Sequence, residues 1–255
     1  MKLSIILTTL GAYLFFLMTQ LPAGLVFSLA KDYLDDVEIA QPEGTFWKGS
    51  SSQVRYADID LGRLQWDARP LNLLLGEWSN RVSVDGTIPG EANIGLSFGP
   101  RVSLSDGIFS FDLADLDLIN PGLAAMGINL GGELSATLDE LVVTEDKLQQ
   151  ADGMLGLEGL VIPGGQNLGN FAGELVTDDE GIMRFAFRSV GDAGPGAEGV
   201  LTMTPDAVIA LDLLVANPDS FGKTFSSIFK SVSASEQGGY RFKWQGELEE
   251  LSRFL

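Results

Sequence analysis

Two residue types that carry much of enzyme chemistry are missing from this 255-residue sequence, which has no histidine and no cysteine. Without cysteine there is neither a disulfide nor a thiol nucleophile, and without histidine there is no imidazole base. The usual ligands of zinc and haem are missing with them. These absences exclude most familiar catalytic sites, and we expect no enzymatic activity, no cofactor and no metal.

Positive charge is also scarce. The chain has 16 lysines and arginines against 35 aspartates and glutamates, which gives a net charge of −19. Such a surface repels phosphate backbones and anionic lipid headgroups. Nucleic acid is therefore not expected as a partner. The acidic excess fits either a basic protein partner or saline surroundings, and the composition does not separate the two.

The first 30 residues are nearly free of charge, with no charged side chain from Leu3 to Ala30. A transmembrane helix needs roughly 20 apolar residues. The alternative is a cleaved signal peptide, because Ser28 and Ala30 place small residues at the −3 and −1 positions of a cleavage site. However, the apolar run reaches Leu21, whereas signal peptides have apolar cores of only about 7–15 residues. We expect residues 1–21 to form a retained transmembrane anchor.

A second helix is expected over residues 22–36. Pro22 suits the first turn of a helix, and the apolar residues that follow recur at near-helical spacing. This pattern favours an amphipathic helix at the membrane surface. Lys2 and the amino terminus favour a cytoplasmic start, although Lys31 stands on the other flank. The apolar residues are Leu25, Val26, Leu29, Tyr33 and Leu34.

After residue 40 the sequence changes to short alternating runs separated by some of its 31 glycines. Alternation bounded by turn residues is typical of strands, as in residues 94–98, 183–188 and 209–215. Residues 177–181, TDDEG, predict a hairpin turn in which Gly181 takes a positive φ. The whole pattern predicts a mainly β chain, with one extended, curved antiparallel sheet and a few short helices in a single domain, residues 37–255.

Two short helices are expected to interrupt the strands. Asn120-Pro121 and Asn217-Pro218 each place a capping residue before a proline suited to the first helical position. The second of these helices would end near Lys230. Residues 70–75 are a third, shorter candidate, and residues 191–199, GDAGPGAEG, are expected to form a loop.

The chemical motifs in the chain are incomplete. Residues 222–224 imitate the end of a P-loop, but Asn217 stands where its glycine belongs. Asp112, Asp115 and Asp117 could ligate calcium, yet leucines alternate with them as in a strand and no calcium-loop motif surrounds them. No GxSxG elbow occurs. A pair of carboxylates for glycoside chemistry stays open, because the required separation is not visible in a sequence.

The segment from residue 21 to residue 76 carries a more specific pattern. It reads LPA at 21–23, GTFWKGS at 44–50 and LGRLQWDARPLNLLLG at 61–76. This pattern resembles the type II secretion system protein N family, in which a GTxWxG element is followed by a tryptophan, a proline and a leucine pair ending in glycine. The matching positions are Gly44, Thr45, Trp47, Gly49, Trp66, Pro70, Leu73, Leu74 and Gly76.

Beyond residue 76 the resemblance rests on total length, on glycine-bounded strands and on a closing strand at residues 238–248. Tyr240, Phe242 and Trp244 are expected to share one face of that strand.

The resemblance implies an accessory component of the machinery that exports folded proteins across the Gram-negative outer membrane. It implies a single-pass inner-membrane protein with a cytoplasmic N-terminus and a periplasmic C-terminal domain, which contacts membrane lipid through its N-terminal helix. Its partners would be inner-membrane and periplasmic type II secretion subunits, bound by assembly contacts, and it implies no catalytic residues.

The resemblance also implies a trough-like sheet of the kind that shields lipid tails, which leaves an alternative function open. The apolar face would then be a groove that binds or transfers lipid, with Phe185 and Leu211 pointing inward. The other interpretation is an ordinary core covered by helices near 120–126 and 218–230. A core is favoured, because an uncovered apolar face of several hundred Å² is unusual in a stable domain.

Trp47 admits three interpretations: part of a catalytic cleft, a surface that stacks on a ligand, or a packing residue. A tryptophan buries about 150–250 Å² when it packs. We expect Trp47 to lie in the first strand after the 22–36 helix and to pack, with Gly44 and Gly49 allowing tight bends around it.

Overall fold

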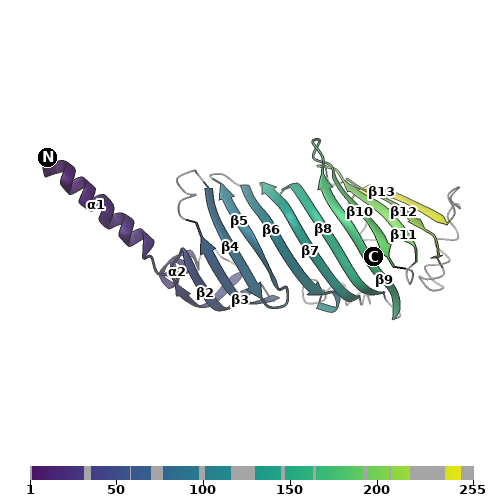
Figure 1. Ribbon diagram of the computed structural model, residues 1–255, viewed down its shortest axis with the longest axis horizontal. Helices are drawn as coiled ribbons and strands as arrows, with labels where there is room; N and C mark the ends of the chain where they lie inside the picture. Colours follow the sequence, from purple (N-terminus) through teal and green to yellow (C-terminus); the bar gives the residue numbers. More distant parts are fainter. Residues whose placement is uncertain are drawn as a thin grey trace. The chain divides into compact units, whose positions relative to one another are not determined.

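The computed structural model is mainly β and describes residues 2–31, 36–57, 59–69, 77–97, 101–115, 130–144, 147–162, 165–191, 195–206, 208–218 and 239–247. Thirteen strands follow one another in the sheet in the order of the chain (Figure 1). Every described strand pair is antiparallel. The predicted fold class is confirmed to this extent. The chain divides into two compact units, Met1–Gly99 and Pro100–Leu255, which are described separately.

The N-terminal unit consists of two helices followed by five strands. Pro22, with an extended ψ of 135°, directly precedes the second helix, which covers the first part of the segment predicted to be helical over residues 22–36. Its elements are α1 (Lys2–Thr19), α2 (Ala23–Ala30), β1 (Val37–Gly44), β2 (Lys48–Tyr56), β3 (Ile59–Ala68), β4 (Glu77–Asp85) and β5 (Gly90–Ser97).

Helix α1 is rich in apolar side chains that stay exposed, among them Ile6, Leu10, Tyr13 and Phe16. Nevertheless, none of the helices in the described ranges is long and apolar enough to cross a membrane. The structure therefore does not support the transmembrane helix predicted at residues 1–21.

The C-terminal unit contains eight strands, and the hairpin predicted at residues 177–181 joins two of them. The backbone N–H of Gly181 donates to Asp178 O over 2.9 Å, and Gly181 has a φ of 76° as expected. The elements of this unit are β6 (Arg101–Asp112), η3 (Leu113–Asp115), β7 (Gly131–Thr144), β8 (Lys147–Ile162), β9 (Gln166–Thr177), β10 (Met183–Val190), β11 (Ala197–Met203), β12 (Val208–Val215) and β13 (Tyr240–Glu247).

A small buried core lies at one end of the last strands of this unit. Ala197, the first residue of β11, and Val215, the last residue of β12, are buried together. The alternation predicted for residues 209–215 is seen only in part, because Ile209 and Val215 are buried whereas residues 210–214 are all half-buried. Phe171, Leu213, Tyr240 and Phe242 pack against the two buried residues.

Several predicted features lie outside the described residues. These are the short helices at 120–126 and most of 218–230, the candidate helix at 70–75, the P-loop-like residues 222–224 and Asp117.

Candidate functional site

The helices of the N-terminal unit are attached to its sheet at one place, which we call the helix–sheet joint. The backbone N–H of Phe46 donates to Leu21 O over 2.8 Å, and Pro22 forms an isolated antiparallel bridge with Thr45. Ala23, at the start of α2, is completely buried. The joint consists of Met18, Leu21, Pro22, Phe27, Thr45, Phe46, Trp47 and Trp66.

Trp47 joins the end of α1 to the sheet. Its indole Nε1 donates a hydrogen bond of 2.7 Å to the backbone oxygen of Met18, and its side chain is only 8% exposed. The backbone oxygen of Trp47 in turn accepts a hydrogen bond from Ala68 N at the end of β3. Both the ring and the backbone of this residue therefore hold separate elements together.

The prediction that Trp47 lies in the first strand is wrong, because the residue occupies the turn between β1 and β2. The N–H of Thr45 donates to Lys48 O over 2.8 Å, and the N–H of Lys48 donates to Thr45 Oγ1 over 3.1 Å. Gly44 enters this turn with a φ of 86°, a conformation that L-residues rarely adopt. The tight turn ends the strand before Trp47 and points the ring toward α1.

Trp66 holds the other side of the joint. Its Nε1 donates to Thr45 O over 3.1 Å, and its ring meets Phe27 of α2 edge to face with centroids 5.4 Å apart. Gly49 lies directly against this ring, so a Cβ at residue 49 would overlap the indole and the backbone oxygen of Glu43. The glycine is therefore required by the close packing of Trp66.

Two further aromatic residues, Phe46 and Trp78, belong to the same cluster as Trp47. Neither was among the motif residues that the sequence pattern identified. Phe46 meets Trp47 edge to face at 5.1 Å and stacks on Trp78 at 5.9 Å. On β4, Trp78 Nε1 and Asn80 Oδ1 are both buried, and neither has a hydrogen-bond partner among the residues that the structure describes. Phe46 falls at the variable position of GTxWxG, so no signal in the sequence identified its contacts.

Three of the nine predicted motif residues, Thr45, Trp47 and Trp66, belong to this joint, and Gly44 and Gly49 lie directly beside it. The other four, Pro70, Leu73, Leu74 and Gly76, lie outside the described residues. The side-chain hydrogen bonds of Thr45, Trp47 and Trp66 run to backbone atoms. The arrangement positions a helix against a sheet and does not assemble a reactive group.

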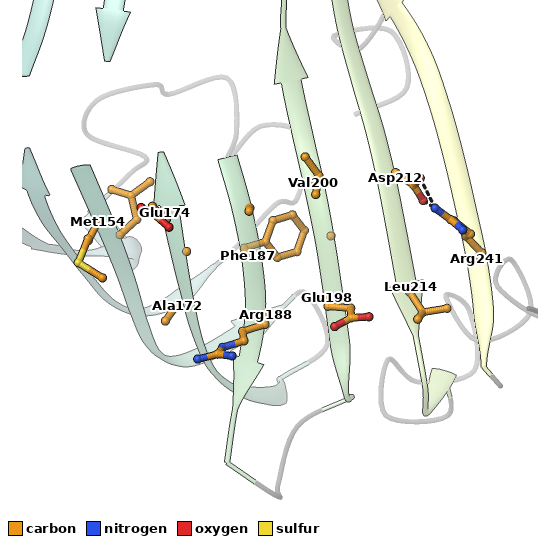
Figure 2. A pocket seen from close by; sticks show the side chains of 14 residues that line it. Met154, Ala172, Glu174, Phe187, Arg188, Glu198, Val200, Asp212, Leu214 and Arg241 are labelled. Carbon is orange, nitrogen blue, oxygen red and sulfur yellow. Dashed lines mark hydrogen bonds and ion pairs between the residues drawn. The ribbon is translucent and has the colours of Figure 1, made fainter. Parts of the chain in front are cut away.

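The C-terminal unit contains a hollow of about 660 Å³ over strands β8 to β13 (Figure 2). Apolar residues contribute to its lining, among them Met154, Leu155, Phe187, Val200 and Leu214. Charged side chains from β9 to β13 lie among them, so the hollow is mixed in character. The charged residues are Glu174, Arg188, Glu198, Asp212 and Arg241.

One charge cluster at the edge of this hollow is well defined. Arg241 of β13 donates from Nε to Asp212 Oδ1 over 2.7 Å and from Nη2 to Oδ2 over 2.6 Å. Lys243 Nζ lies 3.4 Å from the same Oδ2. Hydrogen bonding from Arg241 is the main cause that lowers the pKa of Asp212, and the carboxylate raises the pKa of Arg241.

The lipid-groove alternative gains no support from this hollow. Leu211 and Phe185, the predicted inward residues, alternate with the charged set along β12 and β10, so they lie on the opposite face of those strands from Asp212 and Arg188. The hollow is lined by five charged residues, of which Asp212 and Arg241 form an ion pair, as well as by apolar ones, and it is not a continuous apolar surface.

Two of the aspartates considered as calcium ligands, Asp112 and Asp115, lie among the described residues. Asp112 Oδ1 accepts a hydrogen bond from the backbone N–H of Ala114 over 2.9 Å, which makes it a turn residue before η3. Among the described residues no group of three possible ligands is close enough to hold a metal ion.

Comparison with known families gives a match. The family model described as type II secretion system (T2SS), protein N matches residues 35–195, which is more than half of the chain. Comparison with curated proteins and with solved structures finds no match. The chain belongs to the T2SS protein N family, as the motif between residues 44 and 76 predicted.

Proposed function

We propose that this member of the T2SS protein N family acts as an accessory component of the type II secretion machinery, attached to the inner membrane and working through assembly contacts. The family match over residues 35–195 is the observation that carries the proposal. The N-terminus is cytoplasmic in this proposal and the β units are periplasmic. The partners are inner-membrane and periplasmic subunits of the same machinery.

The exposed side chains of α1 support attachment to the membrane. Ile6, Leu10, Tyr13 and Phe16 are each more than half exposed. Large exposed apolar surfaces mark contact with a membrane or with another protein. Contact with lipid, or with apolar helices of other subunits, would remove these side chains from water.

The helix–sheet joint supports a role in positioning. The bond from Trp47 Nε1 to Met18 O and the bond from Phe46 N to Leu21 O hold the end of α1 and the start of α2 on the sheet of the N-terminal unit. A sheet attached in this way stays close to the membrane that α1 contacts. It is therefore placed to meet other membrane-anchored subunits.

The test of assembly is chemical cross-linking of the full-length protein in native membranes, followed by mass spectrometry of the linked peptides. We expect peptides of other type II secretion subunits. Failure to recover any such subunit at native expression levels would contradict the assembly proposal.

Attachment is tested separately by washing the membranes with alkaline carbonate. Wild-type protein should stay in the pellet, whereas a Leu10→Asp, Phe16→Asp double variant should appear in the supernatant, because two charges on α1 oppose burial in lipid. The control is the double variant Gln149→Asp, Asn167→Asp, which adds the same two charges at exposed positions of the sheet. This control protein should stay in the pellet. Release of wild-type protein would contradict attachment through α1.

A further inference from the structure

Strand β13 is the last strand of the sheet of the C-terminal unit (Figure 1), and among the described residues no strand pairs with its outer edge. In the part of the chain that the structure describes, its one strand neighbour is β12, paired from Val208↔Glu247 to Val215↔Tyr240. Its eight residues pair without a register shift and include no proline and no positive φ. An edge of this kind presents a row of N–H and C=O groups to which another strand can add.

The first strand, β1, differs from β13 because it carries features that protect a sheet edge from pairing with another strand. Gln41 has a φ of 48°, Pro42 removes a backbone donor, and α2 packs against the strand, with Gly24 lying close to Pro42. Proline, local twist and a covering helix are the devices by which proteins block unwanted strand pairing. The described part of β13 has none of these devices.

The two faces of β13 differ in chemistry. Tyr240, Phe242 and Trp244 are half-buried and continue the apolar face, whereas Arg241 and Lys243 are exposed on the other face. Both cations contact the single carboxylate of Asp212. One positive charge is thus left uncompensated by this cluster at the edge of a chain whose net charge is −19.

This charge pattern selects the kind of strand that fits. Side chains directly across two neighbouring strands interact, and opposite charges stabilise the pair whereas like charges destabilise it. Parallel, in-register pairing of β13 with β13 of a second copy would place Arg241 beside Arg241 and Lys243 beside Lys243, which is unfavourable. An added strand with acidic side chains on that face and aliphatic ones on the other is complementary to both rows.

We propose that β13 binds, as an added antiparallel or parallel strand, an extended segment of another protein in which acidic and aliphatic residues alternate. Backbone hydrogen bonds supply the affinity, and the alternating side chains supply the specificity. The identification of that protein as a secretion subunit rests on the function proposed above. The recognition of the segment by β13 is independent of that proposed function.

The test uses the full-length protein in detergent and three labelled eight-residue peptides, with binding followed by fluorescence anisotropy. The first alternates Glu with Val, the second alternates Lys with Val, and the third is the Glu/Val peptide N-methylated at alternate peptide bonds. We expect binding of the first peptide alone, because the second reverses the charge and the third keeps the charge but cannot form the ladder of hydrogen bonds.

Two charge-reversed variants locate the site. Lys243→Glu should weaken binding of the Glu/Val peptide by about fivefold, since it replaces an attractive cross-strand pair by a repulsive one. Lys147→Glu, which makes the same change at the exposed start of β8, should leave binding unchanged. Equal circular dichroism spectra of the two variants show that both are folded.

Failure of the Glu/Val peptide to bind, equal binding of the N-methylated peptide, or equal loss in both variants would overturn the proposal for β13. Cross-linking to secretion subunits is measured independently. If those subunits are recovered but the peptide does not bind, the β13 proposal alone is wrong. If the peptide binds but no subunit is recovered, the secretion assignment is wrong and recognition by β13 stands.

Discussion

At the scale of single residues, Trp47 bonds to two separate elements, to the end of α1 through its ring and to the end of β3 through its backbone oxygen. We expect Trp47→Ala to lower the free energy of unfolding by about 3–5 kcal/mol, because it empties a buried site and removes the bond to Met18 O. Trp47→Phe keeps most of the buried surface, and we expect it to lose only about 1 kcal/mol for the hydrogen bond. The measurement is the urea midpoint of the full chain in detergent.

The neighbouring residue supplies the control for this prediction. Lys48 is exposed and forms an ion pair of 2.7 Å with Asp67, so Lys48→Ala should change the free energy of unfolding by less than about 1 kcal/mol. If the Trp47→Ala and Lys48→Ala variants had the same urea midpoint, the packing role of the Trp47 ring would be contradicted.

The residue scale also shows what the sequence could reveal about the joint. The glycines and tryptophans of the motif were identifiable, and Gly49 indeed lies against Trp66. The contact of Trp47 with Met18 could not be predicted, since the two residues are 29 positions apart and only folding brings the end of α1 to the turn. The partner of a buried donor is set by three-dimensional approach, which residue types alone do not contain.

At the scale of elements, Asp212 links β12 to β13. The pKa of Asp212 is below its ordinary value in the folded protein, because Arg241 donates two hydrogen bonds to the ionised form. A carboxyl with a lowered pKa stabilises the fold above its unfolded pKa, about 3.9. That contribution is lost as the pH falls through the lower, folded pKa.

We therefore expect Asp212→Asn to destabilise the protein at pH 7 and the difference from wild type to shrink below about pH 4. The effect should stay under about 1 kcal/mol, since both partners are partly exposed. Urea midpoints measured from pH 7 down to pH 3 give the difference. Asp139→Asn, at an exposed position of β7, is the control, and an equal pH response in the two variants would contradict the assignment.

Strands were the elements most open to prediction. Met183, Phe185 and Phe187 alternate with exposed residues in β10 as the sequence indicated, because a strand with one covered face must place apolar residues at every second position. The sequence did not show which strand each would pair with, nor that Asp212 would meet Arg241. Pairing depends on register between segments, and alternation is equally consistent with many registers.

At the scale of the whole molecule, the chain lacks the side chains that most hydrolases use. We expect no turnover of nucleotides, peptides or esters by purified protein, because neither a histidine base nor a cysteine nucleophile exists to activate an attack. Each of these three substrate classes is assayed with and without a divalent metal ion. Hydrolysis that persists through purification and disappears with one carboxylate substitution would contradict this expectation.

The order of the strands has a consequence for how the protein acquires its structure. Each described pair joins strands that are consecutive in the chain, so a new strand needs only the one made before it. Lengthening a connection adds little to the entropy cost of closing it, and topologies dominated by contacts between consecutive elements fold quickly. Each unit can therefore grow hairpin by hairpin from its amino-terminal end, while the later part of the chain is still being synthesised and delivered.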